Sequence, residues 1–295
     1  MRFEGGTFAE AYNQALAYLK EAPEYSPRGM RTKELLGCQI YFDDARARLA
    51  LAPGRKYNLA FALAETLWMY AGREDLEFVE RYNKRYRDFS DDGVRLYGAY
   101  GPRVLRHHVR WFQKIRGDPD TRQAVVTVYS NEDLYAATKD LPCTIAWQLF
   151  QRDGRLHMIC TMRSNDIFWG VPYDVFVNTM LLEHWAYQLG LKPGSYTHQS
   201  ASLHVYERHY QWLDMEFASV AMPDQQGTLF MRSLGVAEEM SRELNVVVDP
   251  ANSLVDDCSV VFCRYHLHKR RELAAATTCS LPRDWAAGLV RDFES

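Results

Sequence analysis

The sequence predicts an α+β fold with a mixed β-sheet flanked by helices. Apolar residues recur at helical spacing in several segments, and strand-like segments interleave with them without the regular βαβ alternation of a doubly wound sheet. With 295 residues, 47% of them hydrophobic, the chain is long enough to bury a large core. It has no internal repeat and no low-complexity linker, so we interpret residues 1–295 as one domain that diverges from about residue 210 onward.

Three helices are predicted from their end signals and their apolar spacing. Residues 7–22 start with Thr7, and residues 58–72 start with Asn58 and stop at Gly72. Thr and Asn side chains accept from the free backbone N–H groups at a helix start, and glycine suits the left-handed residue after a helix end. Residues 101–116 form the third helix, because Gly117 and a turn sequence, Asp-Pro-Asp, follow it.

Strands and two further helices are predicted in the second half of the chain. Residues 123–130 have the β-branched content of a strand, and residues 144–164 form two strands joined by Asp153-Gly154, a strong hairpin signal. Residues 175–190 then form a largely apolar helix closed by glycine. Residues 195–206 are extended, and residues 207–218 are helical again.

Composition excludes several function classes. The net charge of −3 argues against a surface that binds nucleic acid. No apolar run is long enough to span a membrane and the N-terminus lacks the apolar core of a signal peptide, so we expect a cytoplasmic protein. The six cysteines are scattered without the spacing of a metal site, so no metal is expected, and most should be buried and inert: Cys38, Cys143, Cys160, Cys258, Cys263 and Cys279.

Cys143 is the exception, because it stands directly after Pro142 at the mouth of a strand. Proline restricts the backbone and strand entry fixes the direction of the side chain, which suits a nucleophile. The alternative is that it is a small core residue, which is the commoner role of an isolated cysteine.

Four separated segments, one of which contains Cys143, form a pattern that favours a functional role for this cysteine. These are DPDTRQ at 118–123, DLPC at 140–143, RDGRLHMICTMRSNDIFWGVPYD at 152–174 and SASLHVYERH at 200–209. In this order and spacing they resemble the folate-dependent thymidylate synthase family. The resemblance implies a homodimer that packs sheet to sheet, 5,10-methylenetetrahydrofolate as co-substrate, and a cysteine thiolate that adds to carbon six of a pyrimidine nucleoside monophosphate. Cys143 matches that nucleophile.

The resemblance also assigns the phosphate ligands. Arg163 matches an arginine beside both the cysteine and the phosphate, where its charge lowers the thiol pKa, and Ser164 matches a hydroxyl donor. Arg28 matches an N-terminal phosphate arginine, with Arg31 as a rival that fits a surface charge better. Arg122 matches an arginine that reaches the phosphate of the partner subunit; the second family arginine is replaced by Gln123.

Other positions correspond to the family's proton-transfer and folate-binding residues. Glu65, inside an apolar helix where an unpaired carboxylate is costly, matches a glutamate that organises water and proton transfers; a partly exposed helix face is the alternative. Asp166 matches the aspartate that binds the pterin ring. The folate cleft would be lined by Trp169, Gly170 and Tyr173, with Arg55 and Asn58 near the folate tail. His204 and Tyr206 match the ligands of the sugar 3′ hydroxyl.

Asp174 departs from thymidylate synthases, which carry asparagine there to read uracil. Cytosine offers a donor at its exocyclic amine and an acceptor at N3. A protonated carboxyl group answers both, and an ionised one pairs with an N3-protonated ring, so Asp favours cytosine. This departure is similar to deoxycytidylate hydroxymethylases and to the CMP hydroxymethylases of mildiomycin-type nucleoside-antibiotic pathways. The alternative is that Asp174 caps the helix that follows it.

Further departures concern the product. The family's Trp-rich segment corresponds here to residues 81–101, which contain no tryptophan, and the C-terminus carries acids in place of a short apolar tail. Thr144 and Met162 replace a histidine and a glutamine. In the family, attachment of the one-carbon unit gives an intermediate with an exocyclic methylene group. A less enclosed methylene favours attack by water, so hydroxymethylation of CMP or dCMP is predicted. The alternatives are cytidylate 5-methylation, dUMP methylation, or a catalytically silent paralogue that binds nucleotide or RNA as a regulator.

Overall fold

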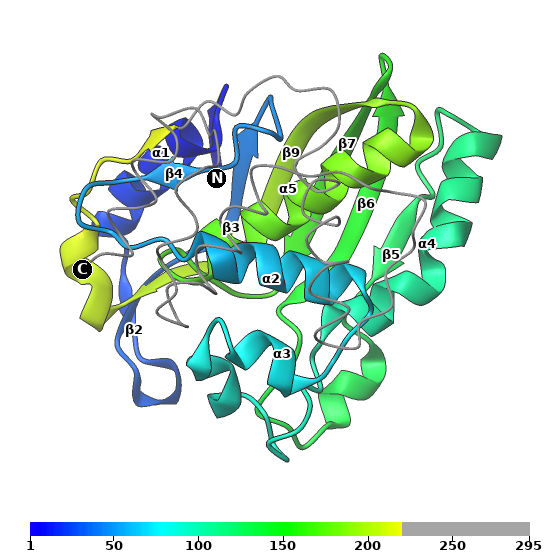
Figure 1. The fold of residues 1–295 in the computed structure, drawn as a ribbon. Helices are drawn as coiled ribbons and strands as arrows, with labels where there is room; N and C mark the ends of the chain where they lie inside the picture. Colours follow the sequence, from blue (N-terminus) through cyan, green and yellow to red (C-terminus); the bar gives the residue numbers. More distant parts are fainter. Residues whose placement is uncertain (220–295) are drawn as a thin grey trace, which may run out of the picture.

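A mixed β-sheet organises residues 1–219, the part of the chain that the computed structural model describes (Figure 1). The central path runs β1-β3-β9-β7-β6-β5, with β2 paired to β3 and β8 to β9. Both β1–β3 and β7–β9 are parallel, whereas β3–β9 and β6–β7 are antiparallel, which confirms the predicted mixed sheet. The strands are β1 (Arg2–Gly5), β2 (Glu24–Tyr25), β3 (Thr32–Phe42), β5 (Val125–Thr127), β6 (Thr144–Arg152), β7 (Arg155–Met162), β8 (Asn165–Asp166) and β9 (Lys192–Tyr206). A separate small sheet pairs β4 (Ala50–Leu51) with β10 (Ala218–Ser219).

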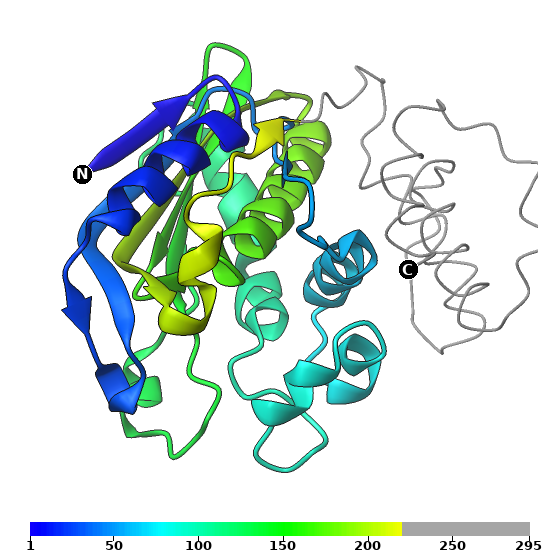
Figure 2. The ribbon, with the colours of Figure 1, turned by 90° about the vertical axis from the view of Figure 1, so that its left-hand side faces the viewer.

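The helices pack largely on one side of this sheet, as the view in Figure 2 shows for α5 and for the cyan helices beyond it. They are α1 (Phe8–Lys20), α2 (Leu59–Tyr70), α3 (Leu76–Glu80), α4 (Tyr100–Gly117) and α5 (Gly170–Leu189). Short 3-10 helices are η1 (Pro27–Gly29), η2 (Lys84–Asp88), η3 (Asn131–Tyr135) and η4 (Glu207–Trp212). The α+β class is therefore confirmed for the described residues.

The end signals in the sequence operate as expected. Thr7 accepts from the Glu10 amide in a capping box, and the Asn58 side chain accepts from the Phe61 amide at 2.9 Å. In the hairpin between β6 and β7, Asp153 and Gly154 have φ values of 50° and 70°. These positive values are what a tight two-residue turn requires, and they fix the register that brings the two ends of the hairpin together.

Three expectations about element boundaries are wrong. Helix α5 begins at Gly170, whereas residues 175–190 were expected to form it. Pro172 does not prevent this earlier start, because proline is tolerated in the first turn of a helix. Residues 207–218 form only the 3-10 helix η4 before β10, and the strand expected at 123–130 is limited to β5. The long strand β3 was not expected, since its half-buried residues give no clean alternation.

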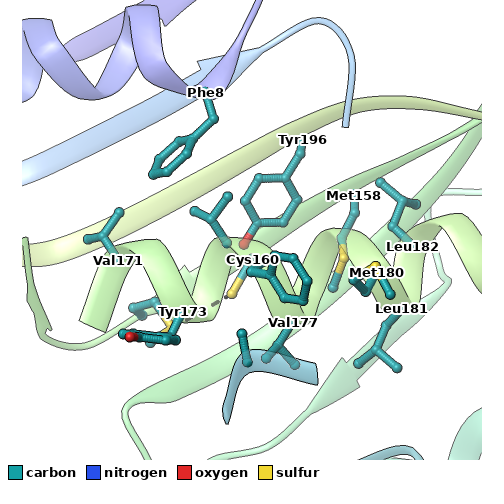
Figure 3. Close-up of a cluster of buried hydrophobic side chains, with 14 of the residues drawn as sticks. Phe8, Met158, Cys160, Val171, Tyr173, Val177, Met180, Leu181, Leu182 and Tyr196 are labelled. Carbon is teal, nitrogen blue, oxygen red and sulfur yellow. Dashed lines mark hydrogen bonds between the residues drawn. The ribbon is translucent and has the colours of Figure 1, made fainter. Parts of the chain in front are cut away.

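The core lies between the sheet and α5 (Figure 3). Met158 and Cys160 of β7 and Tyr196 of β9 face Val177 and Met180 of α5, and all five are almost fully buried. Phe42 of β3 contacts both Tyr196 and Phe8 of α1, so α1 and α5 cover the same face of the sheet. This packing holds the first turns of α5 against the strand ends where the predicted site residues lie.

The described cysteines other than Cys143 behave as inert core residues. Cys38 and Cys160 are buried, and burial raises the pKa of Cys160 to about 12. Within residues 1–219 no cluster of side chains suited to a metal ion is present, and no helix is long and apolar enough to cross a bilayer. Cys258, Cys263, Cys279 and the acidic C-terminal segment lie outside the described residues.

Candidate active site

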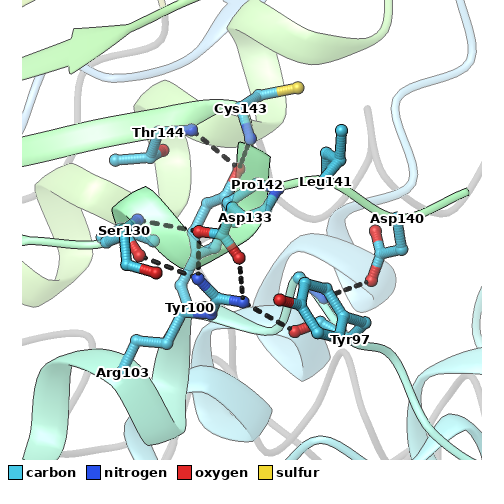
Figure 4. A network of polar contacts seen from close by, with 12 residues as sticks. Tyr97, Tyr100, Arg103, Ser130, Asp133, Asp140, Leu141, Pro142, Cys143 and Thr144 are labelled. Carbon is cyan, nitrogen blue, oxygen red and sulfur yellow. Dashed lines mark hydrogen bonds and ion pairs between the residues drawn. The ribbon is translucent and has the colours of Figure 1, made fainter. Parts of the chain in front are cut away.

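Cys143 is held at the start of β6 by the backbone around it. The hydroxyl of Tyr100, in the first turn of α4, accepts from the Cys143 amide at 3.2 Å and from the Thr144 amide at 3.3 Å. Figure 4 shows the Cys143 sulfur pointing away from this polar network. The thiol is half-buried and packs at the edge of the core, unlike the fully buried Cys38 and Cys160.

A buried ion pair fixes the position of Tyr100. Arg103, one turn further along α4, donates to both carboxylate oxygens of Asp133 at 2.7 and 3.0 Å. Burial raises the pKa of Asp133, but the bonds from Arg103 and from the Ser130 amide outweigh burial and hold the pKa at about 2. The ion pair ties α4 to the loop before β6 and therefore supports the cysteine (Figure 4).

Arg163 lies beside the cysteine, as predicted. Its amide donates to the Cys143 carbonyl at 2.8 Å, and its guanidinium donates to the carbonyls of Pro142 at 2.9 Å and Leu141 at 3.0 Å. The same guanidinium therefore both shapes the loop that carries Cys143 and places positive charge next to it. Ser164 follows directly and is half-buried between this loop and β8.

The expected lowering of the Cys143 pKa is outweighed. Burial is the largest influence and raises the pKa of the thiol above its ordinary value, and the negative charge of Asp174 raises it further. Arg163 and Arg28 each lower it, in the predicted direction, but the effect of each is smaller than that of burial and the net pKa is raised. Without substrate, Cys143 therefore favours the thiol form.

Arg28, rather than Arg31, lies within electrostatic reach of the cysteine. It sits in η1 with a left-handed backbone, φ 54°, and its side chain is exposed. Arg31 instead forms surface ion pairs with Glu24 at 2.6 Å and Glu207 at 2.5 Å. This geometry matches the preference for Arg28 as the phosphate ligand.

Asp174 projects from α5 into the centre of the site. The side-chain amide of Asn165 donates to its Oδ2 at 2.6 Å. Burial raises the pKa of Asp174 to about 7, and the bond from Asn165 lowers it only partly. Because α5 begins four residues earlier and its N-cap is Trp169, the alternative that Asp174 caps this helix is wrong.

Glu65 of α2 is a second acid in the same cluster, and like Asp174 it is half-buried. The hydroxyl of Tyr86, in η2, donates to its carboxyl group. Burial raises the pKa of Glu65 to about 8 despite that bond, and the charge of Asp174 adds to the rise. Two carboxyl groups with raised pKa values beside a nucleophile are typical of proton-transfer sites. Glu65 is half-buried, so the alternative of a partly exposed helix face fits its exposure, and its bond to Tyr86 and its nearness to Asp174 are what favour a place in the site.

Strand pairing brings Asp166 and His204 side by side. They are register partners where β8 runs parallel to β9. Asp166 accepts from the Phe168 amide at 2.7 Å, and burial lowers the pKa of His204. The ring of Tyr206 meets that of His204 edge-on, with centroids 5.1 Å apart, so these two lie together as predicted.

The residues predicted to line a folate cleft surround the start of α5. Trp169 is 39% exposed and donates from its ring nitrogen to His209 at 3.0 Å. Tyr173 accepts from the Asn58 amide at 2.9 Å. Gly170 has a steric role, because a Cβ there would lie 2.8 Å from the Asn165 Oδ1 atom.

Two of the predicted folate-tail residues make contacts inside the protein. The Asn58 side chain caps α2 and donates to the Tyr82 carbonyl at 3.0 Å. The Arg55 guanidinium is buried, donates to the Phe168 carbonyl and lies over the Phe168 ring at 4.4 Å. The Arg55 side chain therefore supports the loop that carries Trp169, whereas the Asn58 side chain ties the start of α2 to the segment after α3.

Arg122 is the predicted residue that does not join the cluster. It precedes β5, and the pairing of Val125 with Gln148 directs it toward the hairpin end of β6, away from Cys143. Along that strand the separation is roughly 15–25 Å, which exceeds the length of an arginine side chain. Its side chain is exposed just before the edge strand β5.

Three residues of the site were not singled out from the sequence: Tyr86, Tyr100 and Asn165. Each acts through a partner that lies far away in the sequence or around a chain reversal. Asn165 stands inside a matched motif, but nothing in the motif indicates its bond to a residue nine positions later. Thr144 and Met162, noted as separate departures, contact each other, because the Thr144 hydroxyl donates to the Met162 sulfur at 2.9 Å.

Comparisons with known proteins identify relatives of this chain. A family model described as thymidylate synthase matches residues 10–232. A deoxyuridylate hydroxymethyltransferase of Bacillus phage SP01 is 36% identical over 227 residues, which cover 70% of this chain and 59% of that protein. A protein of the same name from Pseudomonas phage M6 is 38% identical over 162 residues, covering 52% of this chain and 46% of that one. The chain thus spans about half the length of these relatives.

Proposed function

The chain belongs to the thymidylate synthase family, and on that basis we propose that it is a cytidylate 5-hydroxymethylase. In this reaction a one-carbon unit passes from 5,10-methylenetetrahydrofolate to carbon five of CMP or dCMP, and water completes the product. The sulfur of Cys143 adds to carbon six of the base, which makes carbon five nucleophilic, and leaves when the product forms.

The observation that carries this proposal is the position of Asp174. Its carboxyl group is half-buried in the cluster that contains Cys143 and Glu65, and its removal from water raises its pKa to about 7, so a large neutral fraction persists at physiological pH. A neutral carboxyl group donates one hydrogen bond and accepts another. That pattern complements N3 and the exocyclic amine of cytosine.

The phosphate is bound by residues around the cysteine. Arg163 and Arg28 supply positive charge near Cys143, and Ser164 supplies a hydroxyl donor. A bound nucleotide dianion beside these arginines draws them toward the phosphate. His204 and Tyr206, at the end of β9, would bind the 3′ hydroxyl of the sugar, which ribose and deoxyribose share.

A homodimer is part of the proposal, because Arg122 is too far from Cys143 to reach the phosphate of its own subunit. The sheet face opposite α1 and α5 supports such a dimer. Its alternating side chains are half-buried and mostly uncharged, as for Gln39, Thr161 and Gln199. A second copy packed on this face would bring Arg122 of the partner to the phosphate site.

The residues at the start of α5 fit a folate co-substrate. Trp169 exposes an aromatic surface on which a flat heterocycle can stack, and Asp166 carries a carboxylate toward the same loop. When bound, the folate supplies the one-carbon unit. Asp166 would orient it by hydrogen bonding, while Tyr173 and Gly170 shape the cleft.

Glu65 and Tyr86 support hydroxymethylation over methylation. With a pKa of about 8, Glu65 is mostly protonated at neutral pH, but its ionised form is a stronger base toward water than an ordinary carboxylate, and the hydroxyl of Tyr86 holds its carboxyl group in place. The segment around Tyr86 contains no tryptophan. A water molecule therefore has polar partners next to the carbon that becomes the hydroxymethyl group.

A second candidate function is hydroxymethylation of dUMP, which the names of the two phage relatives favour. The chemistry at carbons five and six is the same, and only the base differs. The carboxyl group of Asp174 argues for cytosine in both of its forms, because the neutral acid donates to N3 and accepts from the amine of cytosine, while the ionised form repels the O4 carbonyl of uracil.

The test is tritium release from carbon five, measured in parallel with CMP, dCMP and dUMP, together with mass analysis of the product. We expect release with a cytidine nucleotide, a 5-hydroxymethyl product, and no absorbance rise from dihydrofolate formation. Turnover of dUMP alone would contradict the assignment of Asp174. Unchanged activity in Cys143→Ala would exclude the covalent mechanism altogether.

A further inference from the structure

Asn165 makes an unusual contact for a residue of a two-residue strand. Its side chain is 4% exposed, its Nδ2 donates to Oδ2 of Asp174 at 2.6 Å, and its Oδ1 has no hydrogen-bond partner within the described part of the chain. Burying the Asn165 side-chain carbonyl without a hydrogen-bond partner costs free energy. Stability alone therefore does not explain why an asparagine lies here, and its bond to Asp174 suggests a functional reason.

The amide is held in one place by its surroundings. Its Oδ1 lies so close to the Gly170 backbone that a Cβ there would approach it to 2.8 Å. The backbone of Asn165 is paired to Leu203 of β9. The side chain therefore presents its N–H groups to a fixed side of the Asp174 carboxyl group.

We propose that Asn165 is a positioning residue that fixes which oxygen of the Asp174 carboxyl group carries the proton, and that this makes Asp174 select cytosine over uracil. The inference rests on the proposed function, because it concerns how the same residue reads the base. It assigns to Asn165 a part in specificity without contact to the reacting atoms.

The chemical argument follows from the direction of the hydrogen bond. Because Asn165 donates to Oδ2, that oxygen is favoured as the carbonyl acceptor, and the proton of the neutral acid resides on Oδ1. Oδ1–H then donates to N3 of cytosine, and the second lone pair of Oδ2 accepts from the exocyclic amine. Both contacts are satisfied in a single arrangement.

Uracil in the same orientation meets two mismatches. Its N3–H group faces Oδ1–H, which places two donors together, and its O4 faces Oδ2, which places two acceptors together. To bind uracil the proton must move to Oδ2, where it competes with the bond from Asn165. Without Asn165 the proton is free to occupy either oxygen, and the carboxyl group accommodates both bases.

Other titratable groups lie near Asp174, and they are the same whether cytosine or uracil is bound. They come from every element packed around it: Glu65 of α2, Tyr86 of η2, Tyr100 of α4, Cys143 before β6, Cys160 of β7 and Tyr196 of β9. Asn165 differs from all of them in donating a hydrogen bond to the carboxyl group while carrying no charge. Its removal therefore changes where the proton resides and leaves the charges of the cluster in place.

The test compares kcat/KM for cytidine and uridine monophosphates of the same sugar in the wild type and in Asn165→Leu, which has similar size but no donor. We expect the cytidylate-to-uridylate ratio to fall on the order of ten-fold, chiefly because uridylate turnover rises. The pH profile with cytidylate should also move to higher pH, since a bond that favours the ionised carboxylate is lost.

The matched control is Asn178→Leu, which removes the amide of a different buried asparagine, one that lies on α5. Asn178 donates to the Tyr196 hydroxyl at 2.9 Å and to the Cys160 sulfur at 3.4 Å, so its loss should not alter the ratio. Should Asn165→Leu not fold, Asn165→Ala carries the same comparison. If the wild type prefers cytidylate and the Asn165 variants keep its cytidylate-to-uridylate ratio to within two-fold, the inference is refuted and the proposed function stays intact. A wild type that prefers uridylate would refute both.

Discussion

The neutral form of Asp174 should be visible in protein stability as well as in catalysis. The perturbation is Asp174→Asn, which keeps the shape of the side chain and removes its titration. In the folded protein the pKa of Asp174 is raised from 3.8 to about 7 by burial. Between these two values the unfolded chain has released a proton that the folded chain retains, so wild-type stability falls as the pH rises through this window.

The difference between the two pKa values corresponds to roughly 4 kcal/mol. The Asp174→Asn variant has no carboxyl group at this position, so it does not lose this stability as the pH rises. Relative to the wild type, its free energy of unfolding should therefore rise by roughly 3–4 kcal/mol between pH 4 and pH 8. For a protein of this size such a change corresponds to a difference in Tm of roughly 6–16 °C.

The measurement is urea unfolding of both proteins at intervals from pH 4 to pH 8. Any constant offset from repacking around the amide cancels, since only the pH dependence of the difference is used. A difference that stays constant within roughly 0.5 kcal/mol would mean that Asp174 titrates normally in the folded state. The neutral acid required for cytosine reading would then not exist at physiological pH, and the argument for hydroxymethylation of cytidylate would lose its main support.

Two further predictions concern the scaffold and the dimer. Asp133→Asn should destabilise the protein by roughly 2 kcal/mol at pH 7, and this loss should shrink to about half at pH 3, because the stability from a pKa lowered from 3.8 to about 2 is complete above this range and is lost as the pH falls through it; a pH-independent loss in urea unfolding would contradict the role of the Arg103 ion pair. Mixing inactive Cys143→Ala subunits with Arg122→Ala subunits should restore about a quarter of wild-type activity if Arg122 serves the partner's phosphate, and no restoration would indicate that it acts within its own subunit.

Much of the architecture follows from local signals. Thr7 and Asn58 cap α1 and α2, and the positive φ values of Asp153 and Gly154 form the predicted hairpin. These signals act within a few residues of each other, so they are readable from the sequence. The motif around Cys143 was equally readable, because its residues lie on strand ends that the hairpin and the parallel β7–β9 pairing bring together.

What the sequence did not indicate depends on contacts between distant segments. Tyr100 is 43 positions from Cys143 and Tyr86 is 21 positions from Glu65, and no periodicity links either pair. The start of α5 was misjudged for a different reason. An aspartate before an apolar run predicts a helix cap, but packing of Val171 and Pro172 in the core extends the helix past it.

That misjudged boundary explains why Asp174 is so sensitive to its neighbours. A capping aspartate would bond backbone amides at a helix start and remain ionised, whereas a carboxyl group one turn inside α5 has no such amides to accept from. It instead shares a buried cluster with Glu65, whose pKa is raised to about 8 by burial and also by the charge of Asp174. Ionisation of either acid therefore opposes ionisation of the other, and at neutral pH the pair tends to retain at least one proton. Asp174→Asn should consequently lower the pKa of Glu65 as well, so a base-reading substitution should also alter the proton-transfer step. We expect kcat/KM profiles of the variant to move to lower pH on the limb that reports Glu65, and an unchanged limb would show that the two acids act independently.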